Sequence, residues 1–547
     1  MTSIGVLSAR DLSVHRGGDV LLSGVSLNVN AGDRIALVGS NGSGKTSLLR
    51  VLVGETAPSA GQVQIAGDLE VSYVPQDVAA APDRTVRDLI TEGLSGLESM
   101  RSELEQLHTR IADADPAVEL DAVLARYQEV FDLHEARDGW GAPLRLAQAK
   151  EALGVNHLDD DVPLARVSGG ERVRLQLAVC YSSQAGLVVM DEPTAHLDVA
   201  GSDWLVQWIV TTKAGVLVAT HDRWLIDAIG ARIASIDVAR KSIIMFDGSY
   251  GQFRRQMKKE QARREQRYLN YESEVQRITA SLHRPTRVGH ARSMRDRNKL
   301  AHNLHGGRVQ KAAATRINAR REELKRLIAK PVGAPAQMVC FQPRFGSAPD
   351  GAGSDRLVEA TEFALRVGDR CLVDGLEFSV ERRSHLCIAG PNGSGKTTVL
   401  KAVASGDSLA YPGLLFAPDL RIGVLTQHVE LDQSGTVRDL LEREAIKHDL
   451  NTHQAFQQLL HTELVVADDL TRPVSSLSGG EQRLLQLAIL SWTPVDLLVL
   501  DEPTNYLSFE FAERLEDGLR MFEGGIVSAS HDRWFLEHVP TSIIELG

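Results

Sequence analysis

The sequence has few cysteines and no long apolar run. Its four cysteines, Cys180, Cys340, Cys371 and Cys387, are scattered over 547 residues without a CxxC pair, so neither a disulfide framework nor a zinc site is indicated. No apolar stretch reaches the roughly 20 residues that a membrane-spanning helix needs. The N-terminus lacks a basic region followed by an apolar run. We therefore expect a cytoplasmic protein without a membrane partner.

The remaining composition is that of a globular protein with several domains. Hydrophobic residues make up 43% of the chain and charged residues 24%, which excludes a wholly disordered or fibrous protein. At roughly 100 to 200 residues per domain, the length allows about three to five domains.

Basic residues are concentrated in one segment. The chain carries a net charge of −12, yet residues 251–330 hold 22 lysines and arginines against 7 acidic residues, a net of +15, which leaves −27 for the rest. Such asymmetry is typical of an element that faces nucleic acid or another acidic surface. A solvated helical hairpin is the alternative that the charge alone leaves open.

The chain contains an internal repeat. Residues 39–46 (GSNGSGKT) recur as residues 390–397 (GPNGSGKT) at an offset of 351, and Gln76 recurs as Gln427. Three later motifs recur at an offset of 310: SGGE at 168 and 478, DEPT at 191 and 501, and HDRW at 221 and 531. The change of offset means that the first copy holds 41 additional residues, in a stretch whose composition predicts helices near 95–150.

Each copy has the pattern of an α/β domain. Short apolar runs at 34–38 and 385–389 lead into the glycine-rich turns, and helical patterns follow the turns. The runs at 187–190 and 497–500 are continuously apolar, as expected for strands buried on both faces of a parallel sheet. The pattern G-x-x-x-x-G-K-[ST] after a strand places backbone N–H groups around phosphates.

The polar residues of these motifs predict magnesium-dependent phosphate chemistry. Lys45 and Lys396 would pair with the β and γ phosphates, while Thr46 and Thr397 would bind Mg²⁺. The strand-end carboxylates Asp191 and Asp501 would bind Mg²⁺ directly or through water. Glu192 and Glu502 would polarise the attacking water. Helix capping is the alternative for the acid pairs, and chance is the alternative for a single glycine-rich match.

A helical hairpin is predicted between the copies. Tyr268, Tyr271, Val275, Ile278 and Leu282 follow a 3,4,3,4 spacing, and a helical stripe resumes at Ile317, Leu324 and Leu327. Proline and glycine interrupt the pattern in a tip at about 283–308. The predicted domains are 1–248, a linker at 249–333 and 334–547.

Taken together, these motifs resemble those of the ATP-binding-cassette ATPases. The resemblance implies Q-loops at Gln76 and Gln427, signatures at VSGGE and LSGGE, and switch histidines His221 and His531. It also implies that the signature of each cassette completes the phosphate site of the other, within one monomeric chain.

The predicted catalytic residues are then His221, His531, Glu192 and Glu502, although a lone histidine is often structural. The metal ligands are Thr46, Asp191, Thr397 and Asp501, for Mg²⁺ with ATP. The ATP-binding residues implied are Gly39, Ser40, Asn41, Gly42, Ser43, Gly44, Lys45, Thr46, Gln76, Ser168, Gly169, Gly170, Gly390, Pro391, Asn392, Gly393, Ser394, Gly395, Lys396, Thr397, Gln427, Ser478, Gly479 and Gly480.

Twin cassettes around a basic hairpin resemble the ABC-F subfamily. The resemblance implies a ribosome partner, with the hairpin in the tRNA exit site and its tip toward the peptidyl-transferase centre, near rRNA and a P-site tRNA. Arginine suits that role because it pairs with phosphate and stacks on bases. The predicted RNA-binding residues are Arg287, Arg292, Arg295, Arg297, Lys299, Arg308 and Lys311.

The sequence departs from the family pattern in two places. The adenine-stacking aromatic residue is replaced by Arg16, or its neighbour His15, in the first copy and by Val367 in the second. The D-loop acid is present as Asp198 in the first copy but is Ser508 in the second. The first change removes the usual basis for adenine selectivity, and the second predicts asymmetric communication between the two ATP sites.

Three functions are compatible with these observations. The first is an ABC-F factor that protects the ribosome from antibiotics acting near the peptidyl-transferase centre, favoured by the long tip. The second is a housekeeping ABC-F factor that regulates elongation. The third, the ATPase subunit of a transporter, gives no reason for +15 of charge between the cassettes.

Overall fold

The structure is a computed structural model of the whole chain. It describes residues 5–40, 42–67, 69–80, 83–112, 120–283, 315, 318–329, 355–367, 370–391, 393–426, 431–447, 456, 470–477, 479–505, 507 and 509–546. One compact unit comprises Met1–Tyr250 with Val339–Gly547, and the other comprises Gly251–Met338. We call residues 5–250 the first cassette and 355–546 the second cassette.

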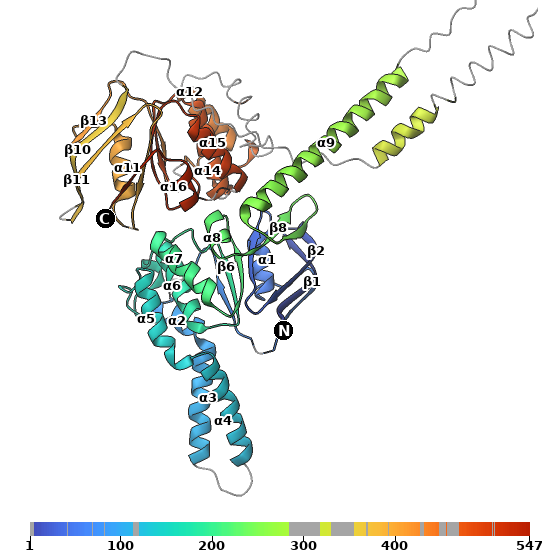
Figure 1. Cartoon of the computed structure of the whole chain (residues 1–547), viewed down its shortest axis with the longest axis vertical. Helices are drawn as coiled ribbons and strands as arrows, with labels where there is room; N and C mark the ends of the chain where they lie inside the picture. Colours follow the sequence, from blue (N-terminus) through green and yellow to red (C-terminus); the bar gives the residue numbers. More distant parts are fainter. Residues whose placement is uncertain are drawn as a thin grey trace, which may run out of the picture. The chain divides into compact units, whose positions relative to one another are not determined.

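The first cassette combines two sheets with a layer of helices (Figure 1). Its strands are β1 (Gly5–Arg16), β2 (Asp19–Asn30), β3 (Arg34–Val38), β4 (Ala60–Ile65), β5 (Val71–Val74), β6 (Leu187–Asp191), β7 (Gly215–Ala219), β8 (Arg232–Asp237) and β9 (Ser242–Phe246). Its helices are α1 (Lys45–Leu52), α2 (Val86–Gly93), α3 (Ser95–Ala112), α4 (Leu120–Ala136), α5 (Ala142–Ala152), α6 (Gly169–Ser183), α7 (Val199–Thr211) and α8 (Arg223–Ala228), with short 3₁₀ turns at Gly139–Gly141 and Leu164–Arg166.

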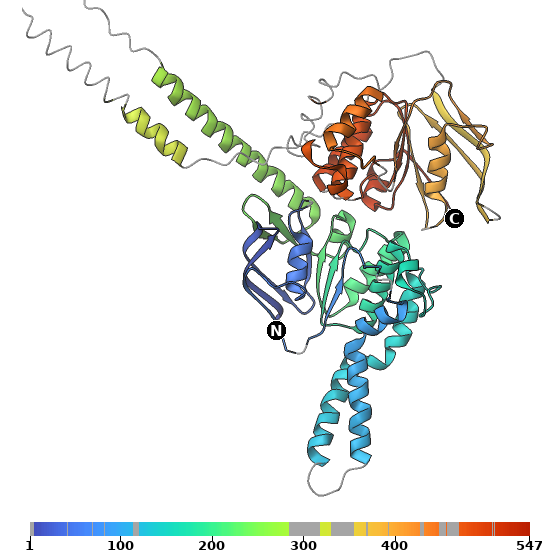
Figure 2. The same ribbon diagram turned by 180° about the vertical axis from the view of Figure 1, so that it is seen from behind.

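The second cassette repeats this plan (Figure 2). Its strands are β10 (Arg356–Val367), β11 (Arg370–Glu381), β12 (His385–Ala389), β13 (Leu414–Phe416), β14 (Ile422–Leu425), β15 (Leu497–Asp501), β16 (Gly525–Ala529) and β17 (Ser542–Glu545). Its helices are α11 (Lys396–Ser405), α12 (Val437–Lys447), α14 (Gly479–Trp492), α15 (Phe509–Arg520) and α16 (Arg533–His538), with a 3₁₀ turn at Val474–Ser476.

The order of the strands brings the repeated motifs together. The larger sheets run β5-β6-β7-β3-β8-β9 and β14-β15-β16-β12-β17, and all their strand pairs are parallel except β8 with β9. In each sheet, the strand before the switch histidine (β7 or β16) lies in the middle of three. On one side is the strand before the glycine-rich loop (β3 or β12), and on the other is the strand that ends in aspartate (β6 or β15). The carboxyl ends of parallel strands lie at one edge, where ligands bind in open α/β sheets. The predicted α/β fold with two tandem cassettes is confirmed.

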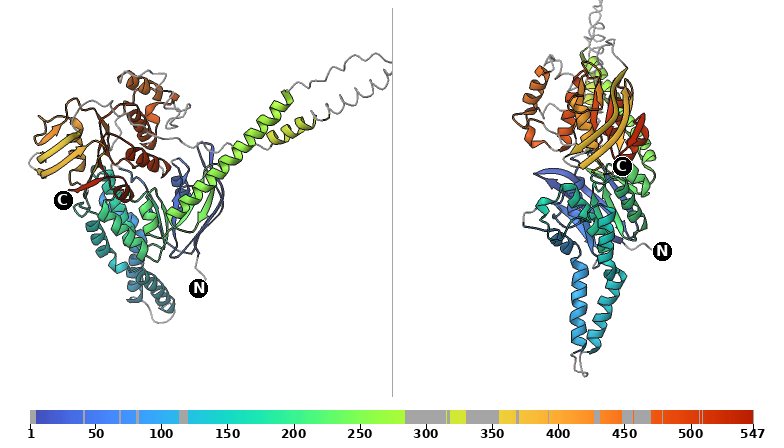
Figure 3. Two further views of the ribbon diagram at one scale, coloured as in Figure 1. Left: turned by 45° about the horizontal axis from the view of Figure 1, so that its top comes forward. Right: turned by 90° about the vertical axis from the view of Figure 1, so that its left-hand side faces the viewer.

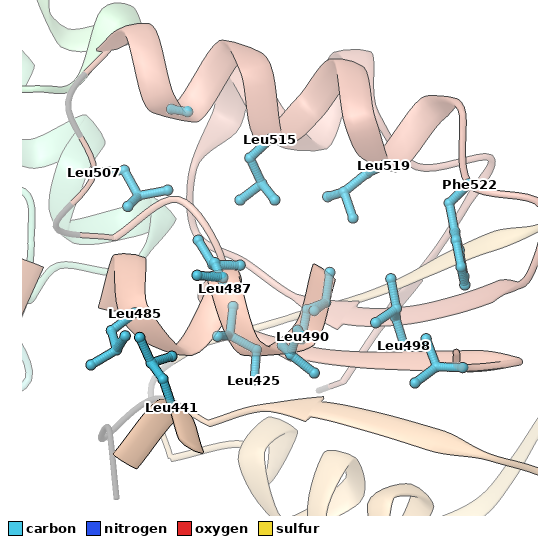
Figure 4. Packing of buried hydrophobic residues seen from close by; sticks show 14 of the residues in the cluster. Leu425, Leu441, Leu485, Leu487, Leu490, Leu498, Leu507, Leu515, Leu519 and Phe522 are labelled. Carbon is cyan, nitrogen blue, oxygen red and sulfur yellow. The ribbon is translucent and has the colours of Figure 1, made fainter. Parts of the chain in front are cut away.

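Leucine-rich cores hold the catalytic strands in place. In the second cassette, Leu498 of β15 packs with Leu487 and Leu490 of α14 and with Leu515 of α15 (Figure 4). Leu498, Leu487 and Leu515 are completely buried. Truncating such a leucine to alanine costs about 2–5 kcal/mol of unfolding free energy, so the strand that ends at Asp501 is rigidly supported.

Two long helices lie where the sequence predicts the insert of the first copy. α3 and α4 run side by side (Figure 3) and pack through Leu104, Leu107, Val123 and Val130. Arg126 on α4 donates to Glu103 on α3 across their exposed side. These helices therefore have a small core of their own.

The predicted first hairpin helix is α9, Tyr250–His283, which has 34 residues and is about 50 Å long at 1.5 Å per residue. The chain is helical again at residues 318–329. The tip residues 284–308 lie outside the described part. None of the described helices combines the length and the apolar composition required to cross a membrane.

Candidate active sites

Each glycine-rich loop links a buried strand to a helix that begins at the predicted phosphate-binding lysine. Gly42 and Gly44 have φ of 75° and 99°, and Gly393 and Gly395 have φ of 81° and 98°. Only glycine adopts such angles without strain. α1 begins at Lys45 and α11 at Lys396, and neither helix has a side-chain cap at its N-terminus. The first backbone N–H groups and the positive end of the helix dipole are therefore directed toward an anion.

The two lysines are held inside their own loops. Lys45 Nζ donates to the carbonyl oxygen of Gly39 at 2.9 Å, and Lys396 Nζ donates to the carbonyl oxygens of Gly390 at 2.9 Å and Pro391 at 2.8 Å. Burial lowers the pKa of both lysines, and the nearby Glu192 and Glu502, respectively, oppose that shift. Both ammonium groups are therefore positioned at the loop and surrounded by acidic residues.

The predicted acid pairs stand at the ends of β6 and β15. Asp191 and Glu502 are buried, and Glu192 and Glu502 both have a φ of 49°. This left-handed backbone turns the glutamate away from the strand direction. Burial raises the pKa of Glu192 and of Glu502 to about 8. Burial also raises the pKa of Asp191 and Asp501.

Each switch histidine contacts the glutamate of its own cassette. The backbone N–H of His221 donates to Glu192 Oε2 at 3.0 Å, and that of His531 donates to Glu502 Oε2 at 3.2 Å. His221 Nε2 lies 2.8 Å from Lys45 Nζ. Because an ammonium group only donates, Nε2 accepts this hydrogen bond and His221 is neutral. Burial, followed by the neighbouring lysine, lowers the pKa of His221 to about 3 and that of His531 to about 4.

The first site has the groups that ATP and Mg²⁺ require. Within the described part of the chain, Ser43 Oγ, Asp191 Oδ2 and Glu192 Oε1 are buried without a hydrogen-bond partner. Such atoms are costly unless a ligand or water satisfies them. The Thr46 hydroxyl bonds to Asp191, and the Thr397 hydroxyl bonds to Asp501, so each site pairs a hydroxyl with a carboxylate as hard oxygen ligands for Mg²⁺.

The first signature starts a helix. Ser168 caps α6: its Oγ accepts from the Glu171 N–H at 3.3 Å, while Glu171 Oε2 accepts from the Ser168 N–H at 2.9 Å. Gly169 and Gly170 form the first turn of α6. Among the described residues, these three form no hydrogen bond with the second glycine-rich loop. That the signature of each cassette completes the phosphate site of the other stays a prediction.

Several predicted site residues lie outside the described part of the chain. They are Asn41, Asn392, Gln427 and Ser478, together with all the predicted RNA-binding residues, Arg287, Arg292, Arg295, Arg297, Lys299, Arg308 and Lys311. Gln76 follows β5 and is half-buried, while Gly479 and Gly480 begin α14. His15 and Arg16, at the end of β1, are exposed.

The repeated HDRW motif forms a contact between the cassettes that the sequence does not predict. Arg223 lies over the ring of Trp534 and forms an ion pair with Glu516, and both charged residues are almost fully buried. Arg533 reciprocally lies 4.1 Å from the ring centre of Trp224 and 2.5 Å from Asp203. A cation over an aromatic face is attractive, and a buried ion pair is costly to break on one side. The residues after both switch histidines therefore join the cassettes.

Arg483 is a second residue that sequence reasoning missed. It is 1% exposed, and it donates to the carbonyl oxygens of Thr426, Asp501 at 2.6 Å and Glu502 at 2.7 Å. Its counterpart at the offset of 310 is Val173. Arg483 therefore fixes the backbone of the acid pair in the second site, where the first copy offers only an apolar side chain at the equivalent position. The signal in the sequence was a charged residue within the apolar stripe of α14.

Comparisons with known proteins agree with this geometry. The family described as ABC transporter matches residues 22–195 and 373–505. The chain is 32% identical over 550 residues to "Tylosin resistance ATP-binding protein TlrC" of Streptomyces fradiae, with 99% of this chain and 97% of the relative covered. It is 28% identical over 550 residues to "Energy-dependent translational throttle protein EttA" of Escherichia coli, with 97% and 91% covered.

A solved structure shares the tandem arrangement of domains. The chain of the archaeal ribosome recycling factor aABCE1, solved in complex with the archaeal ribosomal stalk protein aP1, is similar with a TM-score of 0.59 and 17% identity. The match covers 98% of this chain and 87% of that chain. At this identity the likeness concerns the fold.

Proposed function

The chain belongs to the ABC-F subfamily of the ATP-binding-cassette ATPases, and we propose that it acts on the ribosome. It uses ATP binding and hydrolysis to enter and leave the tRNA exit site. There it protects the ribosome from antibiotics acting near the peptidyl-transferase centre. The chain is an ATPase. The observation that supports ribosome binding is the net charge of +15 on residues 251–330, which include nearly all of α9, in an otherwise acidic chain. The protein would act as a cytoplasmic monomer with its two cassettes paired.

The residues of the first site have distinct roles in this proposal. Lys45 exchanges its bond to the Gly39 carbonyl for the phosphates of ATP, and the uncapped N-terminus of α1 adds backbone donors. Thr46 and Asp191 would hold Mg²⁺, which neutralises phosphate charge when bound. Glu192 orients the attacking water, and His221 contacts the γ phosphate. Lys396, Thr397, Asp501, Glu502 and His531 have the same roles in the second site.

The basic segment predicts a specific dependence on salt. Protein binding to nucleic acid releases counterions, so ribosome association should weaken as the salt concentration rises. Replacing Arg292, Arg295 and Arg297 together by glutamate should lower association and decrease the slope of log K against log salt by about one for each lost phosphate contact. Cosedimentation with ribosomes across a salt series measures both quantities.

The matched control changes charge elsewhere in the chain. Arg84, Arg87 and Arg101 lie in or beside the helices of the first cassette, and replacing them by glutamate alters the net charge equally. This control should retain ribosome association to a greater extent. Unchanged association of the Arg292, Arg295 and Arg297 variant would remove RNA contact by the tip from the proposal, and nucleotide binding should be normal in both variants.

Antibiotic protection is the finer part of the proposal. It is supported by 32% identity along almost the whole chain to a protein named for tylosin resistance, and by the long predicted tip. The test is expression in a sensitive strain, followed by a panel of ribosome-targeting drugs that includes tylosin. We expect higher inhibitory concentrations only for drugs that bind near the peptidyl-transferase centre. An unchanged panel would contradict the protection proposal.

A housekeeping translation factor is the second candidate. It is favoured by 28% identity to the translational throttle protein of Escherichia coli over 97% of this chain. In that case the drug panel would be unchanged, while elongation on purified ribosomes would depend on the protein and on ATP. The ATPase subunit of a transporter is a minor alternative, and copurification with membranes rather than ribosomes would favour it.

A further inference from the structure

A phenylalanine of the second cassette packs against the switch histidine of the first. The ring of Phe509, the first residue of α15, lies 5.4 Å from the His221 ring, with an angle of 66° between the two planes. This is the edge-to-face arrangement that aromatic rings prefer. Phe509 is only 8% exposed. The contact therefore restricts the orientations of the imidazole whose Nε2 lies 2.8 Å from Lys45 Nζ.

The same phenylalanine contacts the first residue of α9. The rings of Tyr250 and Phe509 lie 5.0 Å apart, and Tyr250 is 2% exposed. The Tyr250 N–H donates to Asp227 Oδ1 at 2.6 Å, and its hydroxyl donates to Glu513 Oε1 at 3.4 Å. Asp227 belongs to α8, which begins two residues after His221, and Glu513 lies one turn after Phe509. Tyr250 is thus fixed to both cassettes within one compact unit.

The second site has a different arrangement. At the offset of 310, the counterpart of Phe509 is Val199, which is 38% exposed and whose carbonyl oxygen accepts from Arg533 at 3.2 Å. Among the described residues, His531 has no aromatic ring packed against it. Asp198 instead acts on His531 and Lys396 through its charge. Among the described residues, an aromatic ring therefore packs against the first switch histidine and not against the second.

We propose that Phe509 is a positioning residue for His221, supplied by the second cassette to the first active site alone, and that Tyr250 connects this ring to the base of α9. A shift of α9 at Tyr250 acts on His221 through the Phe509 ring, a ring contact that His531 lacks among the described residues. The first site is thereby the one whose hydrolysis depends on the position of the hairpin helix. The inference rests on the part of the proposed function that assigns hydrolysis to Lys45, Glu192 and His221, and not on ribosome binding.

The test isolates each site with a glutamate variant. E502Q leaves the first site active and E192Q leaves the second active, and single-turnover hydrolysis of ATP is measured in each background without ribosomes. We expect Phe509→Leu, which keeps an apolar side chain of similar volume, to slow hydrolysis roughly tenfold in the E502Q background and to leave the E192Q background unchanged. Nucleotide affinity, measured separately, should change less than twofold, because binding is carried by the loops. Tyr250→Leu should show the same selectivity.

A matched control and a fold check complete the experiment. Val199→Ala changes the equivalent position of the first cassette and should leave hydrolysis unchanged in both backgrounds. Thermal unfolding of every variant identifies loss of fold, and Tyr250→Leu replaces Phe509→Leu should that variant unfold. Equal slowing in both backgrounds, or no slowing in either, would overturn the positioning role. If E502Q itself fails to hydrolyse ATP at the first site, the site assignment falls and the inference falls with it.

Discussion

Replacing Glu192 and Glu502 together by glutamine should slow ATP hydrolysis roughly 10²- to 10⁴-fold and retain the ATP-bound protein on the ribosome. The glutamine amide does not accept a proton from water, while Lys45, Thr46 and the backbone donors that bind ATP are intact. Burial raises the pKa of both glutamates to about 8. Because burial disfavours the charged carboxylate at both positions, the neutral glutamine should not lower the melting temperature. Sedimentation on a gradient with ATP measures the retained complex.

The control for this experiment removes ATP binding instead of hydrolysis. Lys45→Met with Lys396→Met deletes the ammonium groups held at the two loops, and this protein should remain free of ribosomes with or without ATP. Each single glutamine variant should give an intermediate effect. If the double glutamine variant sediments as free protein, like the lysine variant, ribosome binding by the ATP-bound state is wrong.

The repeat made most of the candidate site predictable. Residues such as Lys45, Asp191 and His221 occur in two copies, in the same order and at the ends of apolar runs. A parallel sheet places the ends of such strands at one edge, so the order of the motifs predicts their meeting. The last part of α9 was also predictable, because the apolar residues from Tyr268 to Leu282 repeat at helical spacing.

Features that differ between the copies could not be predicted in this way. Arg483 has Val173 as its counterpart and Phe509 has Val199, so neither stands out as a repeated position. Their roles depend on contacts formed only in three dimensions: Arg483 with carbonyl groups of a neighbouring strand end, and Phe509 with a histidine of the other cassette. The reciprocal pairing of Arg223 with Trp534 was visible as a repeated motif, but a motif does not reveal which residues it contacts.

Shortening residues 287–305 to a brief Gly/Ser connector should abolish antibiotic protection while ATP hydrolysis continues. The predicted tip contains none of the cassette motifs, and connectors of this composition are flexible. α9 and both glycine-rich loops are unchanged by the deletion, so the variant should fold and should cosediment with ribosomes at reduced strength. The inhibitory concentration of a drug that binds near the peptidyl-transferase centre should fall to that of a strain without the protein.

A Gly/Ser connector of unchanged length is the matched control for reach. It removes the arginines of the tip and keeps the contour of the chain, so it separates the loss of length from the loss of RNA contacts. We expect it to retain part of the protection, because a connector of full length can still extend to the drug site. Full protection by the shortened protein would show that the tip is dispensable. Since the tip is the sequence feature that favours protection over the regulation of elongation, that result would make a housekeeping factor the better proposal.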